Sequence, residues 1–207
     1  KLVFGDSGWG DEFLIATIMT LLVSIMSMGL GLCLAIITVW AKLIQNRIAK
    51  LLANFYTTVI RGVPELLVIY LIFFGGNAVV MKIAKIFGYN GYIELNAFTI
   101  ATIAIAIISA TYSSEVLRAA YLSISKGQLE AARALGMNKF SIFIKVICPQ
   151  VIRYALPGIG NVWQITLKDT SLISVTGLVE IMRQSRISSN VEHSPLTFLI
   201  TAAILYL

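Results

Sequence analysis

Charged residues are scarce in this sequence, and their scarcity excludes most soluble folds. Only 13% of the 207 residues are charged, whereas 58% are hydrophobic and the mean hydropathy is +0.87. Soluble domains carry about 25% charged residues. Long apolar runs that cross a bilayer are helical, because a helix satisfies its own backbone hydrogen bonds in lipid. The composition therefore predicts an all-α integral membrane protein.

Cysteine and histidine are also rare, which restricts the chemistry of the chain. Cys33 lies in an apolar run, Cys148 lies in a polar loop, and His193 is the only histidine. We therefore predict no disulfide, no metal site and no catalytic residues. The sequence also lacks the Gly-x-x-x-x-Gly-Lys-Ser/Thr loop that binds ATP phosphates, so an ATP-driven step needs a separate protein.

The net charge of +6 indicates membrane topology rather than nucleic-acid binding. The basic residues gather in two loops between apolar runs and form no stripe with aromatic residues. Lys42, Arg47 and Lys50 belong to the first loop, and the second extends from Arg118 to Arg153. Basic loops stay on the cytoplasmic side. Both loops are therefore predicted to lie inside and the N-terminus outside.

The apolar runs predict a single domain, residues 1–207, with about five membrane-spanning helices. The chain begins without Met and stops inside an apolar run at Leu207, so a truncated C-terminus is expected. Small residues recur in the first run at Ser27, Gly31 and Ala35; this spacing suits close helix packing, although it also arises by chance. The expected spans are 13–41, 51–80, 95–117, 154–180 and 195–207.

Two of these spans contain an interruption. Gly62 and Pro64 are predicted to form a hinge or break in the second span, and Lys168 and Asp169 interrupt the fourth. Irregular backbone at membrane depth is tolerated only where protein or a water-filled path surrounds it. The interruptions therefore indicate places where a path through the membrane is built.

Residues 123–150 form a polar segment between apolar spans. Good helix formers extend from Lys126 to Leu135, and Gly136 follows, the residue favoured just past a helix end. Asn138 can cap a second short helix, and Pro149, which has no backbone N–H, discourages its continuation. The segment is predicted to be a helix, a sharp corner and a helix.

This segment resembles the EAA loop of bacterial ABC-transporter permeases. Their pattern is Glu-Ala-Ala, three residues, Gly, nine residues, Ile, one residue and Leu-Pro. The chain matches it from Glu130 to Pro149, with Val146 and Cys148 in the Ile and Leu positions. The resemblance implies a coupling helix that docks on a cytoplasmic ATPase. The implied coupling residues are Lys126, Gly127, Glu130, Ala131, Ala132 and Gly136.

Residues 61–67, Arg-Gly-Val-Pro-Glu-Leu-Leu, are similar to the Arg-Gly-Thr-Pro-Leu-Leu segment of polar amino acid permeases. Residues 41–47 and 153–161 point to the histidine, arginine and opine branch. The resemblance implies a type I ABC importer permease, multi-pass in the bacterial inner membrane, for polar and cationic amino acids or opines. Its implied partners are two ATPase copies that hold ATP and Mg, a second, non-identical permease, an external solute-binding protein and lipid. No cofactor on this chain and no nucleic acid are expected.

Asp169 is the leading candidate for the substrate path. Ionisable residues inside a span are costly and usually face a partner or a wet cavity. The alternative is an ion pair with Lys168, although adjacent helical residues diverge by about 100°. In relatives an acidic residue in this segment contacts the basic side chain of the solute. They often carry a polar residue where this chain has Val162, so whether this subunit binds solute stays open.

Glu115, Asn161 and Gln164 are further candidates for the path. Each also has a structural alternative. Glu115 can pair with Arg118 at i,i+3, whereas the two amides can bond across helices.

Two other functions remain open on the sequence. An ion-gradient-driven secondary transporter or channel subunit fits the broken spans and Asp169, but it leaves the EAA-like loop without a role. A non-transporting membrane scaffold predicts that substitutions at Glu130 and Gly136 are silent for transport.

Overall fold

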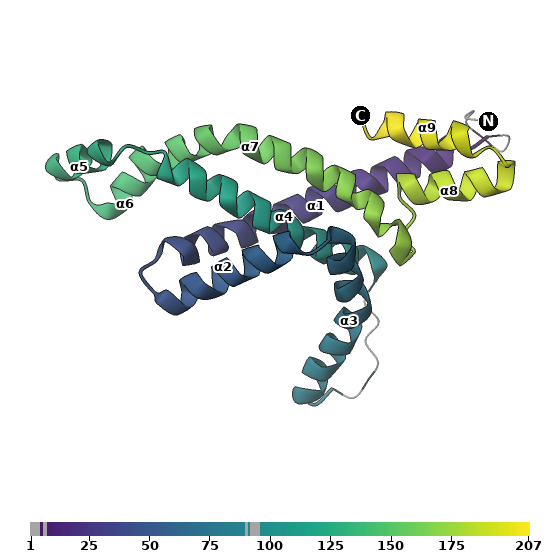
Figure 1. Cartoon of the computed structure of the whole chain (residues 1–207), viewed down its shortest axis with the longest axis horizontal. Coiled ribbons are helices and arrows are strands. Elements are labelled where there is room, and N and C mark those ends of the chain that lie inside the picture. Colours follow the sequence, from purple (N-terminus) through teal and green to yellow (C-terminus); the bar gives the residue numbers. More distant parts are fainter. Residues whose placement is uncertain (1–4, 6–7, 90, 92–95) are drawn as a thin grey trace.

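The computed structural model describes residues 5, 8–89, 91 and 96–207, and every regular element in them is a helix. Figure 1 shows an elongated bundle with α5 and α6 at one end, and α8, α9 and the start of α1 at the other. The α-helices are α1 (Gly10–Leu43), α2 (Arg47–Gly62), α3 (Glu65–Ile86), α4 (Ala97–Leu122), α5 (Lys126–Ala134), α6 (Lys139–Ile142), α7 (Cys148–Asp169), α8 (Ile181–Glu192) and α9 (Pro195–Leu205). A π-helical turn, η1 (Phe143–Ile147), and a 3-10 segment, η2 (Thr170–Thr176), flank α7.

Helix α4 is the centre of the bundle. It packs against α1, α2, α3 and α7, and most of its residues between Ile100 and Ser114 are buried. Apolar side chains from α1, α3 and η2 cluster against those of α4, and burying them removes apolar area from solvent within the bundle. One cluster is Val23, Ala101, Ile105 and Ile173, and the other is Val68, Ile69, Ala104 and Ile108.

The small-residue pattern of α1 packs against α4. Ser27, Gly31 and Ala35 are all buried, and the Ser27 hydroxyl donates a hydrogen bond to the carbonyl of Thr102 at 3.1 Å. A Cβ atom at Gly31 would lie 2.1 Å from Oγ of Ser109. A side chain at position 31 would therefore force the Ser109 hydroxyl to move and would crowd the backbone of α4, whose Ala106 carbonyl oxygen lies 3.2 Å from that Cβ position.

The helix bounds differ from the expected spans. Four helical runs in the described chain are long and apolar enough to cross a bilayer, namely α1, α3, α4 and residues Lys139–Thr176. α9 has only 11 residues. α1 continues to Leu43, so Lys42, expected in a loop, belongs to its last turn. α3 continues to Ile86, beyond the expected end of the second span at residue 80.

Pro149 does not end a helix, so that expectation is wrong. α6, η1 and α7 follow one another without a break, and Pro149 occupies the first turn of α7. A proline is tolerated inside this continuous run because the wider π turn ahead of it changes the backbone hydrogen-bonding pattern locally. One helical run therefore joins the coupling segment to the end of α7.

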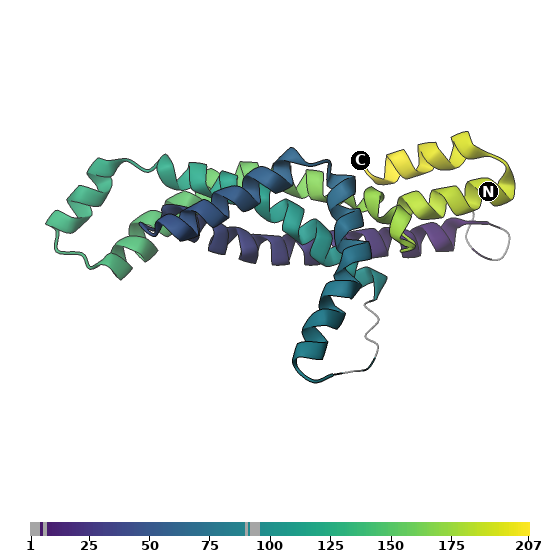
Figure 2. The ribbon, with the colours of Figure 1, turned by 60° about the horizontal axis from the view of Figure 1, so that its bottom comes forward.

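The chain changes direction sharply between α2 and α3. α2 ends at Gly62, Pro64 is the N-cap residue of α3, and the two helices diverge in both views (Figures 1 and 2). Proline favours this break because its fixed φ suits a helix start and it disfavours helical backbone in the preceding residue. The break places Glu65, the first residue of α3, beside α4.

Candidate substrate path and coupling loop

The polar segment forms two short helices around a tight corner. Gly136, with φ of +74°, follows α5, and this left-handed conformation costs glycine less than any residue with a side chain. Asn138 caps α6 by accepting a hydrogen bond from the Ser141 N–H at 2.8 Å. Ser125 stands at the N-cap of α5 but makes no side-chain capping bond. The corner is thus held by Gly136 and Asn138.

The outer surface of α5 is free for a partner. Ala132 is buried at 5% exposure under the neighbouring helix, whereas Glu130, Ala131 and Gly127 are exposed. Small side chains allow close approach of another protein, and the Glu130 carboxylate can accept bonds from a donor there. The α5 surface therefore combines a small apolar contact with one negative charge.

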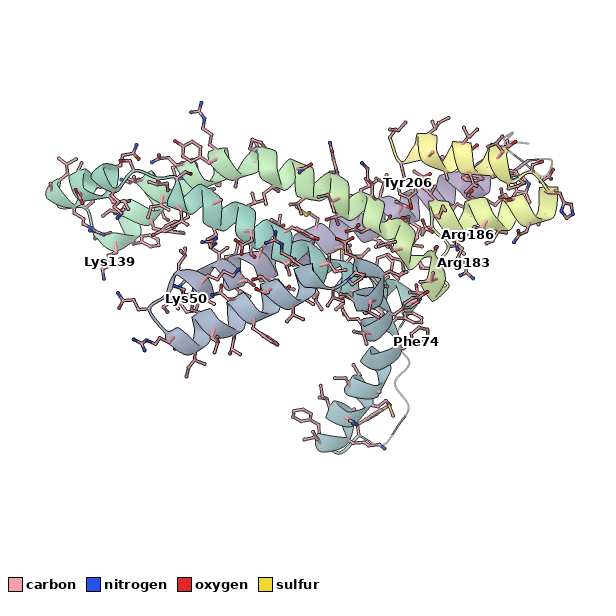
Figure 3. The ribbon with its side chains drawn as sticks, viewed as in Figure 1. Lys50, Phe74, Lys139, Arg183, Arg186 and Tyr206 are labelled. Atoms are coloured by element: carbon pink, nitrogen blue, oxygen red, sulfur yellow. The ribbon has the colours of Figure 1, made fainter. Side chains whose placement is uncertain are left out.

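Basic residues from both segments that were predicted to be cytoplasmic loops lie at the same end of the bundle, although Arg47 and Lys50 belong to α2 and not to a loop. Figure 3 shows Lys50 of α2, shortly after the turn that joins α1 and α2, on the same side as Lys139 of α6. Arg183 and Arg186 of α8 lie toward the opposite end. The positive-inside rule assigns the end with the clustered loops to the cytoplasm. α5 is at that end.

Asp169 ends α7 and is buried, with 8% of its surface exposed. Its carboxyl group lies within hydrogen-bonding reach of Glu65 at the start of α3. Tyr112 of α4 donates its hydroxyl to Oε1 of Glu65 at 2.9 Å. Lys168 is exposed, and the ion pairs found in the described chain do not join it to Asp169. Three helices thus bring two carboxyl groups and a phenol together; we call these residues the carboxyl cluster.

The predicted path residues of α7 are divided between two helix faces. Val162 and Asp169 are buried together with Thr166 on the face toward the bundle. Asn161 and Gln164 are exposed on another face. Asp169 therefore faces Glu65 and Tyr112, the other members of the carboxyl cluster, whereas the two amides lie on a face of α7 away from them.

Glu115 belongs to a second polar group nearer the end of the bundle that carries α5. It accepts a hydrogen bond from Arg118 at 3.0 Å, as the i,i+3 alternative predicted, and it also pairs with Lys42. Lys42 is buried at 7% exposure and donates to Oγ1 of Thr57 at 2.7 Å. A lysine from α1, a glutamate from α4 and a threonine from α2 therefore join three helices.

A polar cavity of about 490 Å³ lies between these two groups. Its size falls in the range of small-molecule sites. Arg61 lines it, with the guanidinium carbon 5.6 Å from the centre of the Tyr112 ring. The other lining residues are Lys42, Asn54, Thr57, Thr58, Gly62, Tyr112 and Glu115.

Glu65, Tyr112 and Lys42 are the residues that the sequence predictions missed. Glu65 could have been identified from the sequence, because it is a charged residue that opens an apolar run directly after Pro64. Lys42 was indistinguishable from a loop lysine, since its burial depends on α2 folding back along α1. Tyr112 resembles any other aromatic residue of an apolar helix.

Buried charges and an open polar cavity inside an apolar bundle suit the passage of a polar solute, because each would be costly in a purely structural membrane helix. The fold defines a membrane transport subunit. The chain belongs to the family of binding-protein-dependent transport system inner membrane components, whose family model matches residues 29–207. It is thus a permease subunit of an ABC importer, the non-catalytic membrane component, with ATP hydrolysis on a separate subunit. This membership decides against the ion-gradient and scaffold alternatives.

Individual relatives cover nearly the whole chain. It is 47% identical to the nopaline transport system permease protein NocQ of Agrobacterium fabrum over 207 residues, 100% of this chain and 88% of that protein. It is 34% identical to the histidine/lysine/arginine/ornithine transport system permease protein HisQ of Escherichia coli, over 97% of this chain and 87% of that protein. A crystal structure of an amino acid ABC transporter with histidines contains a chain with TM-score 0.81 and 32% identity, over 96% of this chain and 87% of that one.

Proposed function

We propose that this permease subunit carries cationic amino acids or opines and binds the solute itself. The observation that supports it is the carboxyl cluster. Two carboxyl groups close together in a poorly hydrated site repel one another as anions, and a guanidinium or ammonium group between them removes that repulsion. A solute with a positive side chain therefore fits, in agreement with the solutes named for the nopaline and the histidine/lysine/arginine/ornithine permeases.

Glu65 supplies the second polar group that Val162 does not. Val162 is buried on the same face of α7 as Asp169 and offers no hydrogen bond. Glu65 reaches Asp169 from α3 instead, across the break at Gly62 and Pro64. The break thus places a carboxylate that a continuous helix would direct elsewhere. This arrangement favours solute binding by this subunit rather than by a partner permease alone.

The coupling role belongs to α5 and the corner after it. Lys126, Gly127, Glu130, Ala131 and Ala132 lie on α5, and Gly136 forms the corner. In this proposal α5 docks on one of two cytoplasmic ATPase copies, which hold ATP and Mg, and the N-terminus lies outside. A second, non-identical permease and an external solute-binding protein complete the importer.

The test is uptake by the reconstituted importer with Asp169→Asn. We expect uptake of radiolabelled arginine to fall by about 10- to 100-fold while the complex assembles normally, because a hydrogen bond to a charged group is lost without a change of side-chain size. Lys168→Gln is the matched control: it removes a charge from the exposed neighbouring residue and should leave uptake unchanged. Normal arginine uptake by Asp169→Asn would make Asp169 structural and would contradict the proposal.

A further inference from the structure

An apolar cavity of about 570 Å³ lies at the end of the bundle that carries α5. Three segments line it: residues between 36 and 44 at the end of α1, Leu117 and Tyr121 near the end of α4, and residues between 143 and 152 in η1 and the start of α7. Apart from the Cys148 thiol, these side chains are aliphatic or aromatic. The cavity shares no lining residue with the polar cavity beside Glu115. It is therefore a separate site, and its lining suits an apolar chain.

Two aromatic residues place this cavity at the membrane surface. Trp40 in the last turn of α1 and Tyr121 at the end of α4 both line it, and Trp40 is 67% exposed. Tryptophan and tyrosine are enriched at the depth where acyl chains meet lipid headgroups, because their rings are apolar and carry one polar atom. A ligand that fits here has an apolar part inside the bundle and a polar part at the surface.

Exposed cations accompany each of the three lining segments. Arg47 follows the end of α1, Lys126 follows the end of α4, and Lys145 belongs to η1. The ion pairs found among the described residues include none of them. Lys50 and Lys139 add positive charge at the same end (Figure 3). The polar part of the ligand is therefore expected to be negative.

A phospholipid combines these properties better than a second protein chain does. Charged residues are depleted in the core of protein interfaces, whereas basic pockets between membrane helices bind anionic headgroups. We propose that this cavity binds an acyl chain of an anionic phospholipid, whose headgroup lies among Arg47, Lys126 and Lys145. The lipid fills the space between α1, α4 and η1, the turn that joins the α5–α6 corner to α7. This inference goes beyond the proposed function and does not depend on which solute is carried.

Lipid binding is measured on the purified permease–ATPase complex in detergent, without solute or solute-binding protein. The complex is titrated with dioleoyl phosphatidylglycerol or with dioleoyl phosphatidylcholine, which have the same acyl chains and differ in headgroup charge. Native mass spectrometry counts the lipids bound at each concentration. The wild type should bind phosphatidylglycerol more tightly, by about fivefold for each basic residue that contacts the headgroup.

Filling the cavity tests the site of the acyl chain. Val151→Trp and Leu117→Trp place an indole in the cavity from two different helices, α7 and α4. Each should bind phosphatidylglycerol at least roughly 10-fold more weakly, because several CH₂ groups of the chain lose their apolar surroundings. Ile103→Trp is the control, since Ile103 is an exposed apolar residue of α4 outside the cavity, and it should leave lipid binding unchanged.

Removing charge tests the site of the headgroup. Arg47→Gln and Lys145→Gln should each weaken phosphatidylglycerol binding by about fivefold and leave phosphatidylcholine binding unchanged. Arg186→Gln, which removes an exposed cation at the opposite end of the bundle, is the control and should change neither affinity.

The outcomes either support or overturn the lipid site. Equal affinity of the wild type for the two lipids overturns the anionic headgroup site. Wild-type lipid binding by both filled-cavity variants overturns the cavity as the position of the chain. If a second permease covers the cavity instead, those variants lose that subunit on size exclusion while their lipid binding stays unchanged, which also overturns the inference. Elution of the intact complex verifies that each variant folds, and either filled-cavity variant alone suffices for the test.

Discussion

Replacing Gly31 by alanine should destabilise the bundle, because α1 and α4 touch at this position. The added Cβ would lie 2.1 Å from Oγ of Ser109 and 3.2 Å from the carbonyl oxygen of Ala106. Overpacking of this kind costs about 1–3 kcal/mol. Alanine also favours a helix over glycine by about 1 kcal/mol, which offsets part of the cost.

Gly29→Ala is the control that separates the cost of overpacking from the gain in helix propensity. Gly29 lies on the same helix, and nothing is within 4 Å of a Cβ built on it. Both variants gain the same helix propensity. The difference between their free energies of unfolding is therefore the cost of overpacking alone, about 1–3 kcal/mol. At about 2–4 °C per kcal/mol for a chain of this size, the Gly31 variant should melt several degrees below the Gly29 variant.

The assay is the melting midpoint of the purified permease–ATPase complex, followed by size exclusion after heating. Ser109→Ala in the Gly31→Ala background should recover part of the loss, because it removes the atom nearest the new methyl group. Among the described residues, the Ser109 hydroxyl donates a hydrogen bond to the carbonyl of Ala106 in its own helix at 3.2 Å and to no other group, so its removal costs little. Equal midpoints for the Gly31 and Gly29 variants would refute the close contact.

Two further perturbations address the polar contacts and the coupling corner. Glu115→Gln should lower the yield of assembled complex, because it removes the carboxylate that balances the buried Lys42 cation, at a cost of about 3–5 kcal/mol. Adding Lys42→Met should restore the yield, and a normal yield for the single variant would show that the cavity hydrates the lysine fully. Gly136→Ala, at φ of +74°, strains the corner by about 1–2 kcal/mol. It should reduce solute uptake per ATP hydrolysed without loss of assembly, and an unchanged ratio would contradict a coupling role for the corner.

The elements that the sequence predicted well are those set by local chemistry. The corner at Gly136 and the cap at Asn138 depend on the conformational preferences of one residue each, and both are where the pattern indicated. The break near Pro64 likewise follows from the missing N–H of proline. These features need no knowledge of the packed bundle.

The carboxyl cluster required tertiary information. Glu65 and Asp169 are 104 positions apart in the sequence, and they meet only because α3 begins beside the end of α7. The contacts of Lys42 also required tertiary information, since its partners Thr57 and Glu115 come from two other helices. Asn161 and Gln164 are close to Asp169 in sequence, but they lie on a different face of α7 because helical periodicity separates them, and their place in the path stays a prediction.

The π-helical turn Phe143–Ile147 fixes a rotational phase along the run from Lys139 to Asp169. A π turn accommodates one residue more than an α turn, and each helical residue advances the side chains by about 100°. Without the extra residue, the face of α7 that carries Asp169 would be turned by about a quarter of a revolution relative to α6. The angle between the corner at Gly136 and the buried Asp169 carboxylate thus depends on one extra residue in the π turn.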